Sequence, residues 1–121
     1  MRKLAVWMTV STAILIAWAT LAPSASLPTP PGNDKVHHLI GFAALTFPAG
    51  LLYQRSLIWV LPFAILFGGM IEIIQPFVGR HREVADFVAG TAGALVGAGI
   101  GWTFRAPMLL AVSRVERFRG P

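Results

Sequence analysis

Two carboxylates and a carboxamide lie within apolar segments in the second half of the chain. Glu72 and Gln75 stand near the end of one apolar run, and Asp86 stands near the start of the next. Ionisable side chains inside such segments are energetically costly, so they generally serve a function or hold a fixed partner. These residues are therefore the first candidates for a functional site.

A second group of polar residues opens an earlier apolar segment. Asp34 and His38 are four residues apart and would share one helix face, as would Glu72 and Gln75 at a spacing of three. An imidazole titrates near neutral pH, which suits proton transfer. We therefore predict Glu72, His38 and Asp86 as catalytic candidates. The residues predicted to bind and orient an anionic substrate are Asp34, Lys35, Gln75 and Arg80.

Each of these residues also has a structural interpretation. His38 could pair with Glu72 or Asp86 and fix one helix against its neighbours. Glu72 could form an ion pair with Arg80, and Asp86 could simply stabilise a helix N-terminus through the helix dipole. Gln75 could orient either Glu72 or a substrate. The sequence leaves open whether the protein is an enzyme.

Metal binding is the weakest chemistry that these residues suggest. His38, Glu72, Asp86 and His81 are all metal-ligand types, but the chain has no ligand spacing such as His-Glu-x-x-His. The chain also has no cysteine, which excludes thiolate chemistry. The spacing therefore predicts no metal site and no cofactor.

The composition points to a bilayer as the solvent of this protein. The chain has 121 residues, of which 55% are hydrophobic and 12% charged, and its mean hydropathy is +0.68. A soluble domain of this size could not cover so much apolar surface. The net charge of +5 comes from residues between and beyond the apolar runs, and not from one stripe, so nucleic-acid binding is not expected.

Four apolar segments are long enough to cross a bilayer as helices, which takes about 20 residues each. They cover residues 4–22, 35–53, 57–77 and 84–104, and residues 105–121 form a basic tail. Four prolines between Pro23 and Asn33 predict a non-helical linker. The fold class is therefore all-α, a single domain built as a four-helix transmembrane bundle. The first segment could instead be a cleaved signal peptide, but it is long for that and is followed directly by Pro23.

The lysines and arginines divide unevenly between the two sides of such a bundle. The side that carries both termini holds Arg2, Lys3, Arg55, Arg105, Arg114, Arg117 and Arg119, and the other side holds Lys35, Arg80 and Arg82. The richer side is expected to be cytoplasmic, so the N- and C-termini face in. His38, Glu72 and Asp86 would then lie at a common depth near the outer face.

The last apolar segment carries a stripe of small residues. Ala89, Gly93, Gly97 and Gly101 recur every four residues. Such a face lets another helix approach closely in a membrane. The partner helix could belong to the same chain or to a second copy, which would make a homo-oligomer.

Taken together, these residues resemble the motifs of the VanZ-like family of small bacterial membrane proteins. The matching residues, in order, are Asp34-Lys35-x-x-His38, Phe42, Glu72-x-x-Gln75, Arg80, Asp86, Gly93 and Gly97. The resemblance covers roughly residues 32–101, and it departs from the family at Gly90, where an Asn is typical. It implies a multi-pass protein of the bacterial cytoplasmic membrane. The founding member is associated with low-level resistance to the glycopeptide teicoplanin through a change at the cell surface.

Two functions are compatible with the whole pattern. In the first, the outer-face cluster binds and modifies an envelope lipid or a lipid-linked precursor, and the bilayer is the main partner. In the second, the protein is a non-enzymatic scaffold or binding module, and the same residues form a structural salt-bridge network. A proton-coupled carrier is disfavoured because the polar groups lie on one side and form no relay across the membrane.

Overall fold

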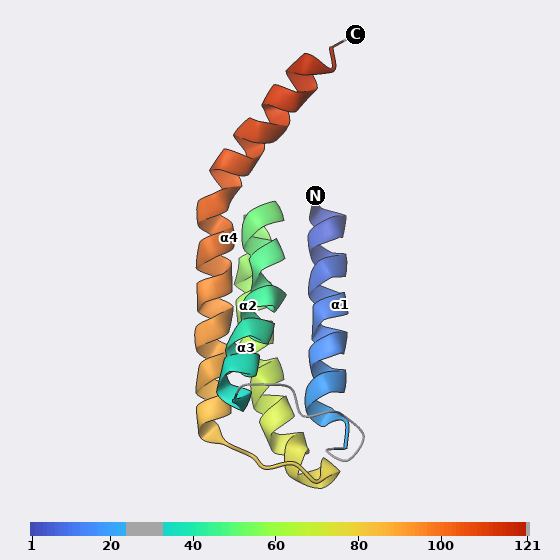
Figure 1. Ribbon diagram of the computed structural model, residues 1–121, viewed down its shortest axis with the longest axis vertical. Coiled ribbons are helices and arrows are strands. Elements are labelled where there is room, and N and C mark those ends of the chain that lie inside the picture. The colour runs from blue at the N-terminus through green and yellow to red at the C-terminus, as the bar shows by residue number, and fades with distance from the viewer. Residues whose placement is uncertain (24–32, 121) are drawn as a thin grey trace.

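The computed structural model describes residues 1–23 and 33–120, and all the regular structure within them is helical. The elements are α1 (Arg2–Leu21), α2 (Asp34–Leu52), η2 (Gln54–Ser56), α3 (Leu57–Ile74), η3 (Gln75–Val78) and α4 (Val84–Phe118). The four α-helices run alternately in opposite directions, so both chain ends lie at the same end of the bundle (Figure 1). The linker predicted between Pro23 and Asn33 lies largely outside the described residues.

Three of the helical segments are long and apolar enough to cross a membrane. These are Arg2–Leu21, Gln54–Val78 and Val84–Phe118. The helix α2 falls outside this group because its first turns hold Asp34, Lys35, His37 and His38. The arrangement fits an integral membrane protein, and a crossing by α2 remains a prediction.

The helix α2 lies at the centre of the packing. It contacts α1 and α3, and its most extensive contact is with α4. The hydroxyl of Thr46 donates to the carbonyl of Ala94 at 2.7 Å and so links α2 to α4. Phe42 and Leu45 are almost completely buried, whereas large apolar side chains on α1, α3 and α4 are exposed. Helices that expose apolar side chains while burying small and polar ones are typical of proteins solvated by lipid.

The small-residue stripe on α4 is the surface that packs against α2. Cβ atoms added at Gly93, Gly97 and Gly101 would overlap with backbone carbonyls of α2. The two backbones are therefore in direct contact, as the stripe predicts. A second copy of the chain would need a different face of α4, and a homo-oligomer remains a prediction.

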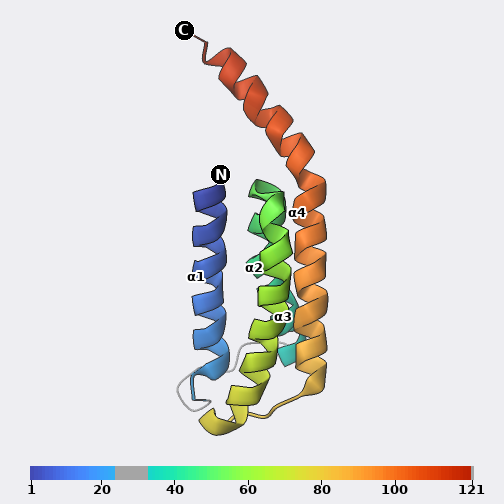
Figure 2. The ribbon, with the colours of Figure 1, turned by 180° about the vertical axis from the view of Figure 1, so that it is seen from behind.

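The helix α4 continues well beyond the predicted spanning segment. It is 35 residues long, which corresponds to about 50 Å at 1.5 Å per residue, and it projects past the other helices in both views (Figures 1 and 2). Residues 105–118, predicted as a basic tail, continue the helix because they are mostly good helix formers. Pro107 lies inside this part, and proline is the usual cause of a bend in a helix.

Candidate functional site

Three of the predicted residues meet at the end of the bundle where α2 and α4 begin and α3 ends. His38 comes from α2, Glu72 from α3 and Asp86 from α4, and one ligand atom of each lies within 4.8 Å of the others. Their exposed fractions are 7%, 6% and 3%. We call these three residues the His–Glu–Asp cluster.

A tight turn after α3 returns the chain to this cluster. Pro76 has no backbone N–H, and the α-helix gives way to the 3-10 turn η3 at this point. Gly79 then ends η3 with a φ of 76°, in the left-handed region that only glycine adopts without a steric cost. The N–H groups of Gly79 and Arg80 both donate to the carbonyl of Gln75. The chain is thereby turned so that α4 can start beside the end of α3.

Glu83 closes the loop over the cluster through two different groups. Its backbone N–H donates to Oε2 of Glu72 at 3.0 Å, and its carboxylate pairs with Nζ of Lys35 at 2.8 Å. The start of α4 is thus tied to α3 and to α2. Among the described residues, Oε1 of Glu72 and Oδ1 of Asp86 are buried without a hydrogen-bond partner.

The predicted cations surround the cluster and do not enter it. Lys35 is engaged with Glu83, and Nε of Arg80 donates to the carbonyl of Ala22 at 2.8 Å. The suggested ion pair between Glu72 and Arg80 is therefore not formed, and Lys35–Glu83 is the one salt bridge among residues 1–23 and 33–120. Arg80 instead fixes the loop against the end of α1.

The remaining predicted residues differ in their placement. Gln75 is buried, with an exposed fraction of 4% and no hydrogen-bond partner for its Oε1 within the described chain. Asp34 is exposed in the first turn of α2, next to the N-cap Asn33, and His81 is exposed in the loop. The structure therefore keeps Gln75 with the buried groups and places Asp34 and His81 at the surface.

Phe42 supports the cluster, although the sequence suggested no role for it beyond the family motif. Its ring stacks on that of His38, with a centroid separation of 6.2 Å and an interplanar angle of 12°. A Cβ added at Gly90 would come within 3.2 Å of this ring, and one at Gly68 within 3.3 Å. Gly90, where the VanZ-like family typically has Asn, thus leaves the space that the ring of Phe42 occupies.

The pH dependence of the Lys35–Glu83 pair can be predicted. The hydrogen bond and charge of Lys35 lower the pKa of Glu83 below its ordinary value. A lowered pKa in the folded state means that the pair stabilises the protein above the unfolded-state pKa of about 4.3. This contribution is lost as the pH falls through the lowered pKa of Glu83.

Substitution of Glu83 by Gln should therefore lower the melting temperature slightly at pH 7, and the difference from wild type should shrink as the pH falls below about 4. The effect is small because the side chains are 46% and 52% exposed. Thermal unfolding of both proteins in detergent at several pH values measures it. A difference that grows towards low pH would contradict the assignment.

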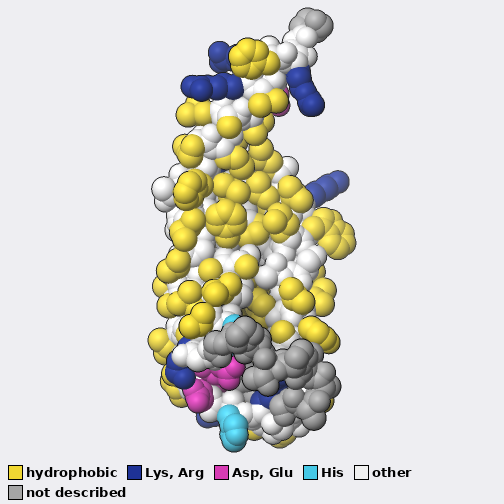
Figure 3. All heavy atoms as spheres, viewed as in Figure 1, with side chains coloured by type: hydrophobic (Ala, Val, Ile, Leu, Met, Phe, Trp, Pro, Cys, Tyr) yellow, Lys and Arg dark blue, Asp and Glu magenta, His cyan; other side chains and the backbone are white. Residues whose placement is uncertain are grey.

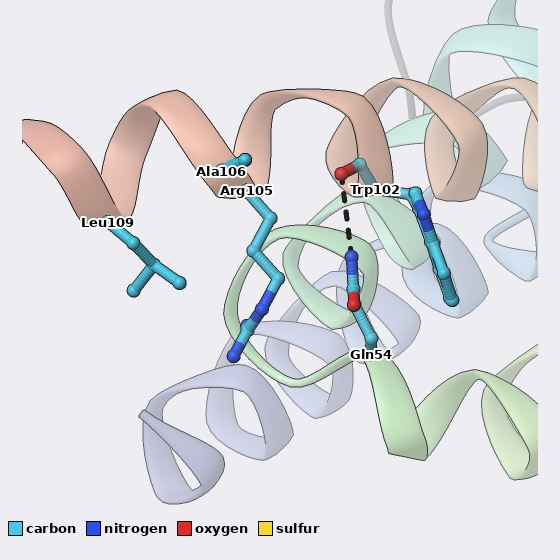
Figure 4. A pocket seen from close by; sticks show the side chains of 5 residues that line it. All are labelled: Gln54, Trp102, Arg105, Ala106 and Leu109. Atoms are coloured by element: carbon cyan, nitrogen blue, oxygen red, sulfur yellow. Dashed lines mark hydrogen bonds between the residues drawn. The ribbon is translucent and has the colours of Figure 1, made fainter.

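A groove at the opposite end of the bundle is separate from the cluster. It is lined by Gln54, Trp102, Arg105, Ala106 and Leu109 (Figure 4). Nε2 of Gln54 donates to the carbonyl of Trp102 at 3.4 Å, and Nη1 of Arg105 donates to that of Leu51 at 3.0 Å. The hydrogen bonds of Gln54 and Arg105 thus join α4 to η2 and to the end of α2.

The charged side chains at the surface gather at the two ends of the long axis of the molecule (Figure 3). Figure 3 shows acidic, histidine and basic side chains together at the end opposite the C-terminus, further basic side chains on the C-terminal extension, and a mostly hydrophobic surface between them. The cluster therefore lies at the end that carries the loop between η3 and α4, and the arginine-rich part of α4 lies at the other end.

Comparison of the chain with family models, curated proteins and solved structures gave no match. The resemblance to the VanZ-like family rests on the motif residues alone.

Proposed function

We propose that this chain is an integral membrane protein of a bacterial cell envelope whose His–Glu–Asp cluster binds and modifies the headgroup of an envelope lipid or a lipid-linked precursor. The observation that carries the proposal is the convergence of an imidazole and two carboxylates from three helices within 4.8 Å. Acid–base side chains that gather in a place shielded from water are typical of functional sites.

The chemistry of the cluster suits proton transfer. Glu72 and His38 would share the transfer of a proton to or from a headgroup oxygen, a contribution of roughly 10²–10⁴ in rate. Asp86 would orient the imidazole of His38. Because the site is shielded from water, hydrogen bonds made there are stronger than at the surface.

The surrounding cations suit an anionic headgroup. Lys35 and Arg80 are held by Glu83 and by the carbonyl of Ala22, and both partners lie at the same end of the bundle as the cluster. A phosphate group would compete with these partners because it accepts charge-assisted hydrogen bonds from both residue types. Binding would then displace the loop and open the cluster.

The outer surface near the cluster suits contact with lipid. Phe77 in η3 is 85% exposed, and Ile73 on α3 is 59% exposed. Apolar side chains of this kind are stable where they meet acyl chains, and aromatic rings are common at the headgroup level. A lipid could therefore approach from the α3 side with its headgroup at the depth of the cluster.

The proposed orientation can be measured with single cysteines, because the chain has none of its own. In intact cells, a membrane-impermeant maleimide should label His81→Cys, and it should label Arg55→Cys only after the membrane is permeabilised. His81 and Arg55 are both exposed, so access to the reagent is decided by the side of the membrane. Labelling with the opposite pattern would place the cluster on the cytoplasmic side and would exclude an outer-face function.

The function itself is tested by substitutions within the cluster. Cells producing Glu72→Gln or His38→Ala should lose the change in envelope-lipid composition and in glycopeptide sensitivity that the wild-type protein causes. Glu116→Gln and His81→Ala are matched controls, because Glu116 and His81 are exposed and lie outside the cluster. Protein levels must be equal in the membranes compared. If the cluster variants act like wild type at equal levels, the proposal fails.

A scaffold is the second candidate, favoured by the bond between the Glu83 backbone and Glu72 that joins the loop to α3. In that case the cluster stabilises the fold. Removing one partner of a buried polar network should then cost roughly 3–5 kcal/mol and lower the amount of protein in the membrane. If the cluster is catalytic, the variants should instead keep the wild-type amount of protein in the membrane and lose activity. Measuring the amount of protein and the activity therefore separates the two functions.

A further inference from the structure

We infer that His38, Glu72 and Asp86 form a binding site for one divalent transition-metal ion of the Zn²⁺ or Mn²⁺ class. The site would use one imidazole nitrogen and two carboxylate oxygens. The inference is tested by metal binding alone. It alters the proton transfer proposed above, because His38 and Glu72 cannot carry the proton through the same atoms that hold an ion.

The possible ligand atoms of the cluster are close enough together to surround one ion. All three lie within 4.8 Å of one another. Metal–ligand bonds of about 2.0–2.2 Å place ligand atoms roughly 3–4 Å apart around an ion. Small rotations of the side chains would close that difference without a movement of the helices.

Each of the two carboxylates has one oxygen without a hydrogen-bond partner among the described residues. Oε1 of Glu72 and Oδ1 of Asp86 are buried, and within the described chain neither has a hydrogen-bond partner. Buried polar atoms without a partner are uncommon in folded proteins and call for an unseen ligand, ion or water. Both residues are more than nine-tenths buried, and one carboxylate oxygen of each lies within 4.8 Å of a ring nitrogen of His38.

A divalent ion would balance the negative charge of the two buried carboxylates. Two ionised carboxylates buried without a cation would be strongly destabilising. Lys35 is paired with Glu83 and Arg80 with the carbonyl of Ala22, so within the described residues neither carboxylate of the cluster forms a salt bridge with a lysine or an arginine. A divalent ion with a neutral imidazole and two carboxylates gives a centre with no net charge, which suits a site at the edge of a bilayer.

Neighbouring groups contact two of the proposed ligands, Glu72 and His38. The N–H of Glu83 holds Oε2 of Glu72, which fixes the orientation of that carboxylate and leaves Oε1 for an ion. The ring of Phe42 lies parallel to that of His38, with the ring centroids 6.2 Å apart. Outer-shell contacts of this kind orient the ligands in known metal sites.

The donor set narrows the choice of metal. Imidazole suits Zn²⁺ and its neighbours, carboxylates suit Mn²⁺ and Mg²⁺, and a mixed site favours ions that accept both. Without thiolates, a soft ion such as Cu⁺ is disfavoured. Three protein ligands would leave at least one position open for water or for an oxygen of a bound anion.

The test measures metal binding on the purified full chain in detergent, with any affinity tag removed and the protein first treated with EDTA. Wild-type protein equilibrated with ZnCl₂ or with MnCl₂ should retain about one ion per chain by mass spectrometry of the metal. X-ray absorption of the Zn²⁺-loaded protein should show a first shell of nitrogen and oxygen with the multiple-scattering pattern of one imidazole.

Single substitutions identify the ligands. Glu72→Gln, Asp86→Asn and His38→Gln should each weaken binding by more than the roughly 10–100-fold loss typical of outer-shell changes. Glu116→Gln and His81→Gln should bind like wild type, since neither residue belongs to the cluster. Circular dichroism and gel filtration confirm that each variant is folded.

Two results would overturn the inference. One is wild-type protein that binds neither Zn²⁺ nor Mn²⁺ at micromolar free metal. This result would indicate that the three side chains are held together by hydrogen bonds and not by an ion. The other is an absorption spectrum of the loaded wild-type protein without an imidazole ligand, which would indicate adventitious surface binding. Both use only the wild-type chain, so a variant that fails to fold cannot mask the outcome. A third result is that the wild-type protein binds the metal while substitutions in the cluster leave the envelope lipids unchanged. That result would refute the proposed function and would not affect the metal site.

Discussion

Replacing Gly97 with alanine should force α2 and α4 apart and destabilise the protein at the upper end of the roughly 1–3 kcal/mol that overpacking costs. The reason is that a Cβ at position 97 would overlap with the backbone carbonyl of Ala43. A side chain could rotate away from such a contact, whereas a backbone carbonyl within a helix cannot. The strain would therefore be relieved only by moving one helix.

The matched control for this substitution is Gly99→Ala in the same helix. A Cβ at Gly99 meets no other atom within 4 Å, so this variant should be as stable as wild type or slightly more stable. Unfolding in mixed micelles with increasing SDS measures the free energy of both variants. Equal stability of the two variants would show that α2 and α4 are not in backbone contact.

Replacing Phe42 with alanine should be the most damaging change to the apolar core near the cluster. Phe42 is 1% exposed and is the largest fully buried side chain of the described residues. Phe→Ala in protein cores typically costs about 3–5 kcal/mol. The lower part of that range is expected here, because lipid solvates apolar groups and the loss comes mainly from packing.

The same substitution should also affect His38, because the ring stacked beside its imidazole is lost. Zn²⁺ affinity should therefore fall in Phe42→Ala, even when the protein is kept folded at low temperature. Phe104→Ala is the control, since Phe104 is 57% exposed on α4 and its loss should cost less than about 0.5 kcal/mol. If Phe42→Ala and Phe104→Ala proved equally stable, the buried position of Phe42 would be contradicted.

Much of the helical architecture follows from the sequence because hydropathy and prolines mark the segments. The predicted run 57–77 corresponds to α3 and η3, and the change between them falls at Pro76, the residue that cannot continue the hydrogen-bond pattern. The small-residue stripe on residues 89–101 predicts a close helix contact, and α2 makes that contact. The hydropathy of α2 itself is reduced by its polar first turns, so its crossing is less well marked than the others.

The grouping of His38, Glu72 and Asp86 was predictable from topology, since alternating helices bring the start of α2 and α4 to the end of α3. The partners of the cations were not predictable. Arg80 binds a backbone carbonyl at the end of α1 and Lys35 binds Glu83, and such choices depend on the path of loops that carry no periodic signal. The sequence pattern predicted no metal site, and the metal site inferred above rests instead on side chains that three separate helices bring together.

The direct backbone contact between α2 and α4 has a mechanical consequence. With glycine against carbonyl at three successive turns, neither helix can slide or roll against the other without steric overlap. Two of the three residues of the cluster, His38 and Asp86, therefore belong to one rigid pair of helices. A movement that exposes the cluster would then have to come from α3 and the loop that follows it.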